Sequence, residues 1–219
     1  MNKERPILFN TEMVQAILAD KKTMTRRIVK PQPVKSNDGK FDWIDNGAWK
    51  GAINPKNGNH NLKCPYGEVG DILWVRETWA QLDMDYRAVS GKLDIQEFKG
   101  CPIAYKADND APEHFNCWRP SIHMPRYASR IFLKVTNIRV ERLQDITEED
   151  AMDEGIEWTE EGPLHAHYHD HKLNASLNFK TAKEAFKSLW DGINAKRGYS
   201  FQSNPFVWIV EFERIEGGK

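Results

Sequence analysis

Helical periodicity marks three segments of the chain. In residues 12–20, apolar side chains recur at three- and four-residue spacing, directly after two residues that can cap a helix N-terminus, Asn10 and Thr11. Residues 181–193 repeat that pattern. Residues 147–155 begin with the capping-box sequence TEED and reach a glycine that can end a helix. The sequence therefore predicts three helices.

Alternation and short apolar runs predict strands elsewhere. Residues 131–140 alternate apolar and polar side chains, and residues 72–75 and 206–212 fit buried strands. Residues 102–105 give a shorter candidate. Several strands with few helices between them favour a mainly β fold with flanking α-helices (α+β), arranged as an antiparallel β-barrel with the helices on its outside.

The length of 219 residues suits a single domain covering residues 1–219. Three polar segments, near residues 31–63, 80–125 and 157–180, are interpreted as insertions into it. The first is rich in Gly and Asn and predicts an irregular excursion with a short hairpin around Trp43 and Trp49. The proline-containing sequence WRPSIHMPRYASR, near the end of the second, predicts a loop.

Cysteine spacing, apolar runs and nucleotide motifs limit which compartment and which cofactors we expect. The three cysteines are widely spaced and form no CxxC pair, which argues against a disulfide framework or a cysteine zinc site. No apolar run is long enough for a signal peptide or a membrane span, so we expect a cytoplasmic protein. No Gly-rich nucleotide motif occurs, and no cofactor is expected. The alternating histidines from His165 to His171 could bind a metal on a strand, but in a polar insertion we interpret them as solvated and expect no metal site.

Charge is distributed unevenly although the formal net charge is only −1. Residues 21–40 hold seven Lys or Arg against one acid, and residues 141–161 hold ten Asp or Glu against one base. A local positive patch can bind phosphate even in a neutral protein. The other interpretation is that the basic segment and the acidic segment are both solvent-exposed faces without a ligand. Eight tryptophans could stack on bases, but most are expected to fill the core.

The densest chemistry lies in the sequence KKTMTRR, residues 21–27. Its four cations, Lys21, Lys22, Arg26 and Arg27, can neutralise a phosphate or polarise a carbonyl oxygen. A threonine hydroxyl becomes a nucleophile when a nearby base accepts its proton. A lysine can be that base only if burial or neighbouring cations lower its pKa.

Four sequence blocks, in order along nearly the whole chain, resemble the ASCH superfamily. KTMTRR at 22–27 resembles the signature G-x-K-x-x-T-x-R, and GDILWVRE at 70–77 resembles the strand that follows it. LQDITEEDA at 143–151 is similar to the acidic helix start, and NPFVWIVEF at 204–212 to the closing strand. The whole pattern is similar to longer ASCH proteins of phages and prophages. The chain departs from the signature at Asp20, where the family has glycine.

The resemblance implies a PUA-like β-barrel and a partner that is RNA or a modified nucleoside. Some small ASCH proteins are amidohydrolases that deacetylate 4-N-acetylcytidine, and their Lys, Thr and Glu match Lys22, Thr25 and Glu154. The implied reaction is attack by the Thr25 hydroxyl, aided by Lys22, with Glu154 as proton donor to the leaving amine. Two alternatives remain open: a non-catalytic RNA-binding module using the same basic segment, and a metal-dependent ribonuclease.

Further polar residues are candidates for substrate or nucleic-acid binding. Glu77 follows a buried strand and is a candidate partner for a pocket cation. A second phosphate-binding group lies on the proline-rich loop and consists of Arg119, His123, Arg126 and Arg130.

Overall fold

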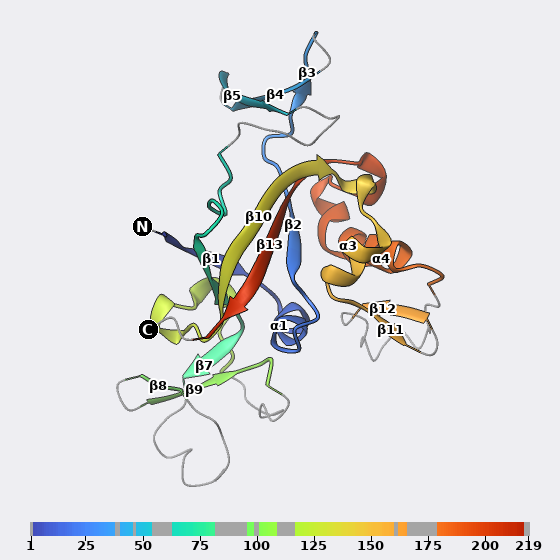
Figure 1. The fold of residues 1–219 in the computed structure, drawn as a ribbon. Coiled ribbons are helices and arrows are strands. Elements are labelled where there is room, and N and C mark those ends of the chain that lie inside the picture. The colour runs from blue at the N-terminus through green and yellow to red at the C-terminus, as the bar shows by residue number, and fades with distance from the viewer. Residues whose placement is uncertain are drawn as a thin grey trace.

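A computed structural model shows the fold of the chain (Figure 1). It describes residues 2–37, 40–45, 47–53, 63–81, 96–98, 101–108, 117–159, 162–165 and 179–216. Within these residues, no helix combines the length and the apolar character needed to cross a bilayer.

The centre of the fold is a five-stranded sheet. Its strands, in spatial order, are β1 (Glu4–Leu8), β6 (Ile72–Arg76), β10 (Phe132–Arg142), β13 (Phe206–Ile215) and β2 (Met24–Ile28). β1 runs parallel to β6, and every other neighbouring pair is antiparallel. β10 and β13 form the long central pair, with one irregularity in register between Val135 and Asn137.

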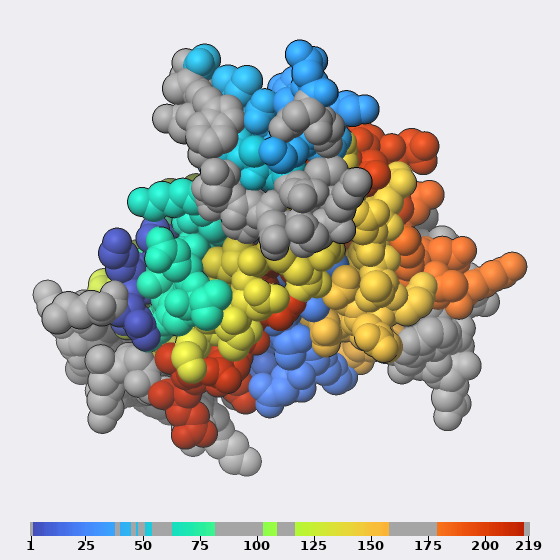
Figure 2. All heavy atoms as spheres, turned by 45° about the horizontal axis from the view of Figure 1, so that its top comes forward, coloured from blue at the N-terminus to red at the C-terminus, as the bar shows by residue number. Residues whose placement is uncertain are grey.

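Smaller sheets surround this one. Three strands, β3 (Val34–Lys35), β4 (Phe41–Asp45) and β5 (Ala48–Ile53), form a meander at one end of the main sheet, and Figure 2 shows its light-blue atoms gathered there. A second three-stranded sheet has the order β7 (Trp79–Gln81), β9 (Cys101–Tyr105), β8 (Gln96–Phe98), and β11 (Ile156–Thr159) pairs with β12 (Gly162–His165). These sheets occupy the segments that the sequence marks as insertions.

In the described part of the chain, three α-helices lie against the main sheet. They are α1 (Thr11–Leu18), α3 (Glu148–Asp153) and α4 (Ala182–Asn194). α1 is capped by the side chain of Asn10, which accepts from the Met13 N–H at 2.9 Å. α3 begins with the expected capping box, in which Thr147 and Asp150 satisfy each other's backbone N–H groups. The three predicted helices are therefore confirmed.

The sheet buries apolar side chains on both faces. Along β13, Trp208 and Val210 pack with α1, β1 and β6 in one cluster. Their neighbours Val207 and Ile209 pack with α3 and α4 in another. Because side chains alternate along a strand, this two-sided burial explains why residues 206–212 form an unbroken apolar run.

The expected closed barrel is not what the strand pairing gives. The main sheet is open, because β1 and β2 are its two edges and do not pair with each other within the described residues. One side chain links the two edges, since Arg27 of β2 donates to the backbone oxygen of Leu8 in β1 at 2.7 Å. The broader prediction, a mainly β protein with a few helices, is confirmed.

Two local predictions, a hairpin and a loop, agree with the structure. The hairpin expected around Trp43 and Trp49 is confirmed, because β4 and β5 pair there. Residues 118–130 form two 3-10 turns, Ser121–His123 and Arg126–Ala128, and an isolated bridge from Arg119 to Trp79, which agrees with a loop. Residues 166–178, which carry the later histidines, lie outside the described part of the chain.

Candidate functional site

The edge strand β2 and the end of α3 bring the candidate residues together. Lys22, just before β2, forms an antiparallel bridge with Glu154, the residue that caps the C-terminus of α3. The adjacent backbone N–H of Thr23 donates to the carbonyl oxygen of Asp153 at 2.9 Å. These backbone contacts fix two segments that are more than 120 residues apart in sequence, and the side chains at their ends meet as a result.

Lys22 and Glu154 form a buried ion pair. Lys22 Nζ lies 2.6 Å from Glu154 Oε2, and the two side chains are only 1% and 5% exposed. The same ammonium also donates to the backbone oxygen of Glu154 at 2.8 Å. An ion pair that is removed from water is held tightly when extra hydrogen bonds satisfy its remaining donors.

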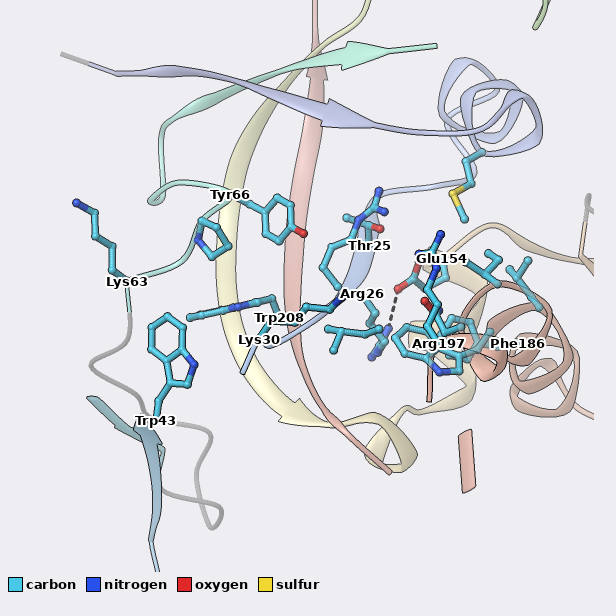
Figure 3. A pocket seen from close by; sticks show the side chains of 18 residues that line it. Thr25, Arg26, Lys30, Trp43, Lys63, Tyr66, Glu154, Phe186, Arg197 and Trp208 are labelled. Carbon is cyan, nitrogen blue, oxygen red and sulfur yellow. Dashed lines mark hydrogen bonds and ion pairs between the residues drawn. The ribbon is translucent and has the colours of Figure 1, made fainter. Parts of the chain in front are cut away.

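Arg26 joins that pair to a second carboxylate. Its guanidinium contacts Glu154 Oε1 at 3.4 Å and Asp150 Oδ2 at 2.7 Å, and its side chain is 1% exposed (Figure 3). Asp150 also accepts from Arg139 at 3.1 Å. Three cations therefore share two carboxylates, and Glu154 is held from two sides.

Burial lowers the pKa of Lys22 below its usual value of 10.5. The neighbouring charge of Glu154 opposes this effect, and the nearby guanidinium groups of Arg26 and Arg27 add to it. A lysine in this environment gives up its proton more readily than a lysine in water, which is the property that a general base requires.

A cavity of about 590 Å³ opens beside this cluster. Volumes of this size are typical of small-molecule sites. Figure 3 shows Glu154 and Phe186 on one side of it and Trp43 and Lys63 on the other. The lining residues come from α1, β2, β4, β13, the end of α3, the turn before β6, and α4 with the turn that follows it: Met13, Thr25, Arg26, Arg27, Ile28, Lys30, Trp43, Lys63, Pro65, Tyr66, Glu154, Phe186, Leu189, Trp190, Ile193, Asn194, Arg197 and Trp208.

Thr25 lies in the wall of the cavity. It pairs with Val210 of β13 and is 2% exposed. Its hydroxyl forms no hydrogen bond with any residue that the structure describes. The next residues on the strand face opposite ways: Arg26 stacks over Phe186 of α4, and Arg27 lies over the Phe9 ring, 5.1 Å from its centroid. Lys22 Nζ also lies over Phe9, at 6.0 Å, so the ammonium is on the Arg27 side of the strand.

Lys21 lies apart from the cluster, although it neighbours Lys22 in sequence. Its Nζ pairs with Glu157 at 2.8 Å, both side chains are well exposed, and Lys21 does not line the cavity. Of the four cations in residues 21–27, two therefore line the cavity, Arg26 and Arg27, and one is buried against Glu154.

The structure places the second predicted group elsewhere. Glu77 is buried and accepts two hydrogen bonds from Arg130, at 3.0 and 3.1 Å. Arg126 pairs with Glu4 at 2.6 Å, and Arg119 stacks on Trp79. None of these residues, nor His123 in its 3-10 turn, lines the cavity. Burial raises the pKa of Glu77 while the hydrogen bonds from Arg130 oppose that rise, so the pair fits a role in holding the loop.

Several cavity residues were not among the candidates from the sequence. Trp43 and Tyr66 come from the first insertion and the turn that follows it, and Asn194 comes from the end of α4. Lys30, Lys63 and Arg197 are exposed cations at the cavity that form no ion pair with a described residue. Only Asn194 had a local signal, because it is a polar residue in the otherwise apolar stripe of a helix.

Among the described residues, no group of three or more His, Cys, Asp or Glu side chains is arranged to hold a metal ion. Comparisons of the chain with models of known families, with curated proteins and with solved structures gave no match. The resemblance to ASCH proteins thus remains a prediction from the four sequence blocks.

Proposed function

We propose that the chain hydrolyses the amide of an N-acylated cytidine, either in RNA or as a nucleoside, with Lys22, Thr25 and Glu154 as its catalytic residues. The observation that carries this proposal is the buried contact of 2.6 Å between Lys22 and Glu154. It lies next to a cavity whose wall contains Thr25, and the hydroxyl of Thr25 has no hydrogen-bond partner among the residues that the structure describes. A nucleophile, a base with a lowered pKa and a carboxyl group are what acyl transfer requires.

The ion pair supplies both proton-transfer groups at once. Moving the shared proton across the short contact converts ammonium and carboxylate into amine and carboxylic acid, with no change in the number of bound protons. The Lys22 amine then accepts the proton of Thr25 as its oxygen bonds to the acyl carbon. The Glu154 acid protonates the exocyclic nitrogen as the C–N bond breaks.

The second half of the reaction reverses these roles. The acyl group is now an ester of Thr25, and Glu154 is a carboxylate that can take a proton from water. The water oxygen bonds to the acyl carbon, and Lys22 returns a proton to the departing Thr25 oxygen. The products are cytidine and a carboxylic acid. Lys22 is then an amine and Glu154 a carboxylic acid, and return of the proton from Glu154 to Lys22 restores the resting ion pair.

The rim of the cavity supports a ligand that carries phosphate. Lys30, Lys63 and Arg197 border the cavity without an acidic partner among the described residues. Figure 3 shows Lys63 and Arg197 on opposite sides of it, and cations at separate points of the rim can contact phosphates of a nucleic-acid backbone. A PUA-like ASCH fold belongs to this proposal as well, as an open variant of the family barrel.

The test is turnover of 4-N-acetylcytidine, free and within a short RNA, followed as release of cytidine. We expect turnover by the wild-type chain and a loss of roughly 10²–10⁴-fold in Glu154→Gln. Thr25→Val should abolish it. Thr23→Val is the matched control, because Thr23 is exposed and does not line the cavity. Absence of turnover in the wild type would refute the proposal. Salt-sensitive RNA binding without turnover would instead identify a binding module.

A further inference from the structure

Asn194 is out of place in the packing of α4. The buried residues of this helix are Ala182, Ala185, Phe186, Leu189, Trp190 and Asn194. The first five make an apolar stripe, and Asn194 extends it by one turn beyond Trp190. An amide at such a position costs free energy unless its donors and acceptor find partners.

The carboxamide of Asn194 has no partner within the protein that the structure describes. The residue is 8% exposed and lines the cavity. Its backbone oxygen accepts from Tyr199, but its side chain neither caps the following 3-10 turn nor bonds to any described residue. Buried side-chain amides in native proteins are nearly always hydrogen-bonded, either to protein or to water. Water in the cavity can supply these bonds in the free protein, and a ligand that displaces this water has to supply them in its place.

The rest of the cavity wall favours a flat aromatic partner. Trp43, Tyr66 and Trp208 line it together with Trp190. Indole and phenol rings offer faces on which a heteroaromatic ring can stack. The indole N–H of Trp43 is likewise buried and unpaired among the described residues.

We propose that Asn194 reads the base of the ligand, by pairing its carboxamide with an adjacent donor and acceptor on the edge of a nucleobase. The choice of cytosine as that base rests on the proposed function. Asn194 Oδ1 accepts from the exocyclic N–H, and its Nδ2 donates to ring nitrogen N3. An N-acyl group leaves one hydrogen on the exocyclic nitrogen, so substrate and product present the same pair of atoms. Asparagine pairs with adenine in this two-bond manner in DNA recognition.

Binding, rather than turnover, tests this assignment. We would titrate the wild-type chain by calorimetry with cytidine and with 3-deazacytidine, which has the same shape but carries C–H in place of N3. A complete two-bond contact is worth roughly 5- to 150-fold in affinity, and 3-deazacytidine loses one of the two bonds. We expect cytidine to bind about tenfold more tightly than 3-deazacytidine in the wild type, and the ratio to fall to about one in Asn194→Leu.

Two further measurements separate recognition from structural support. Replacing an unpaired buried amide by an apolar group of similar size is neutral or stabilising, so Asn194→Leu should unfold at or above the wild-type temperature. Asn194→Asp keeps the size of the side chain and the acceptor but loses the donor to N3, so it too should lose the preference for cytidine over 3-deazacytidine.

The outcomes distinguish this inference from the proposed function. An unchanged ratio in both variants, or no binding of cytidine by the wild type, overturns the role of Asn194. Cytidine binding that depends on Asn194, in a protein without hydrolytic activity, upholds the inference while refuting the hydrolase. Hydrolysis by the wild type, together with a cytidine to 3-deazacytidine affinity ratio that is the same in the Asn194 variants, supports the hydrolase and overturns the inference.

Discussion

Lys22 donates to both the carboxylate and the backbone carbonyl of Glu154, at 2.6 and 2.8 Å. The first contact depends on the side chain of Glu154 and the second does not. A change at Glu154 therefore leaves the ammonium buried with one neutral acceptor, while its position remains fixed by the backbone bridge between the two residues. The effect of a Glu154 substitution on stability can thus be measured while the position of Lys22 stays the same.

The ion pair should show strong coupling in unfolding experiments. We expect Glu154→Leu to lower the free energy of unfolding by about 3–5 kcal/mol, because it leaves Lys22 buried without a counter-charge. Adding Lys22→Met should recover a large part of that loss. Denaturant titration measures both effects.

The control for the buried Lys22–Glu154 pair is an ion pair on the protein surface. Lys134 and Glu213 are 2.8 Å apart, but their side chains are 47% and 53% exposed. Glu213→Leu should change stability by only about 0–1 kcal/mol. Equal costs for Glu154→Leu and Glu213→Leu would show that the Lys22–Glu154 pair contributes little to the fold.

Gly155 is required by the backbone and by its neighbours. Its φ is +97°, and an added Cβ would lie 3.2 Å from the Cβ of Ala16 and 3.5 Å from that of Lys22. Gly155→Ala should therefore destabilise the chain by at least about 1 kcal/mol and disturb the site. Gly192→Ala is the control, since that glycine is exposed inside α4 with open space around it. Thermal unfolding should show Gly192→Ala more stable than wild type, by roughly 0.5–1 kcal/mol.

Local sequence patterns predicted the helices and strands in which apolar residues recur at regular spacing. The helices of residues 12–20 and 181–193 and the strand of residues 131–140 appear close to their expected places. β2 was not predicted as a strand, because its sequence MTRRI contains two adjacent arginines and is typical of a basic loop. It becomes a strand because β13 pairs with it and because acids far along the chain neutralise Arg26.

The site was predictable only in part, for the same reason. Lys22 and Thr25 lie in one dense motif, and Glu154 was found through the resemblance rather than through any local pattern. Trp43, Tyr66 and Asn194 come from three separate parts of the chain and meet only in the folded protein. The sequence makes Glu77 and Arg130 candidates for ligand binding, because it does not reveal that they pair with each other.

Asp20 occupies the position at which the ASCH signature has glycine, and it adopts a left-handed conformation with φ of 55°. Asp20→Gly should remove roughly 1 kcal/mol of backbone strain and lose only an exposed ion pair with Arg214. We therefore expect a small net stabilisation in thermal unfolding. Asn204→Gly is the matched comparison, because Asn204 has φ of 46° but its side chain accepts from the Gln144 N–H at 2.9 Å. That variant should be less stable than wild type, and stabilisation by both would indicate that the side-chain contact is unimportant.

The lowered pKa of Lys22 makes a prediction about alkaline stability. In the folded chain the ammonium loses its proton at a lower pH than in the unfolded chain, where its pKa is close to 10.5. Between these two values the unfolded state binds more protons, so raising the pH favours the folded state. The unfolding free energy of wild type, taken relative to Lys22→Met, should therefore increase as the pH rises from neutrality to 10.5. Lys21→Met, which removes an exposed lysine, should give a difference that does not rise in this way. A difference for Lys22→Met that falls over the same range would mean that the contact with Glu154 outweighs burial, and that Lys22 stays protonated where a general base must be neutral.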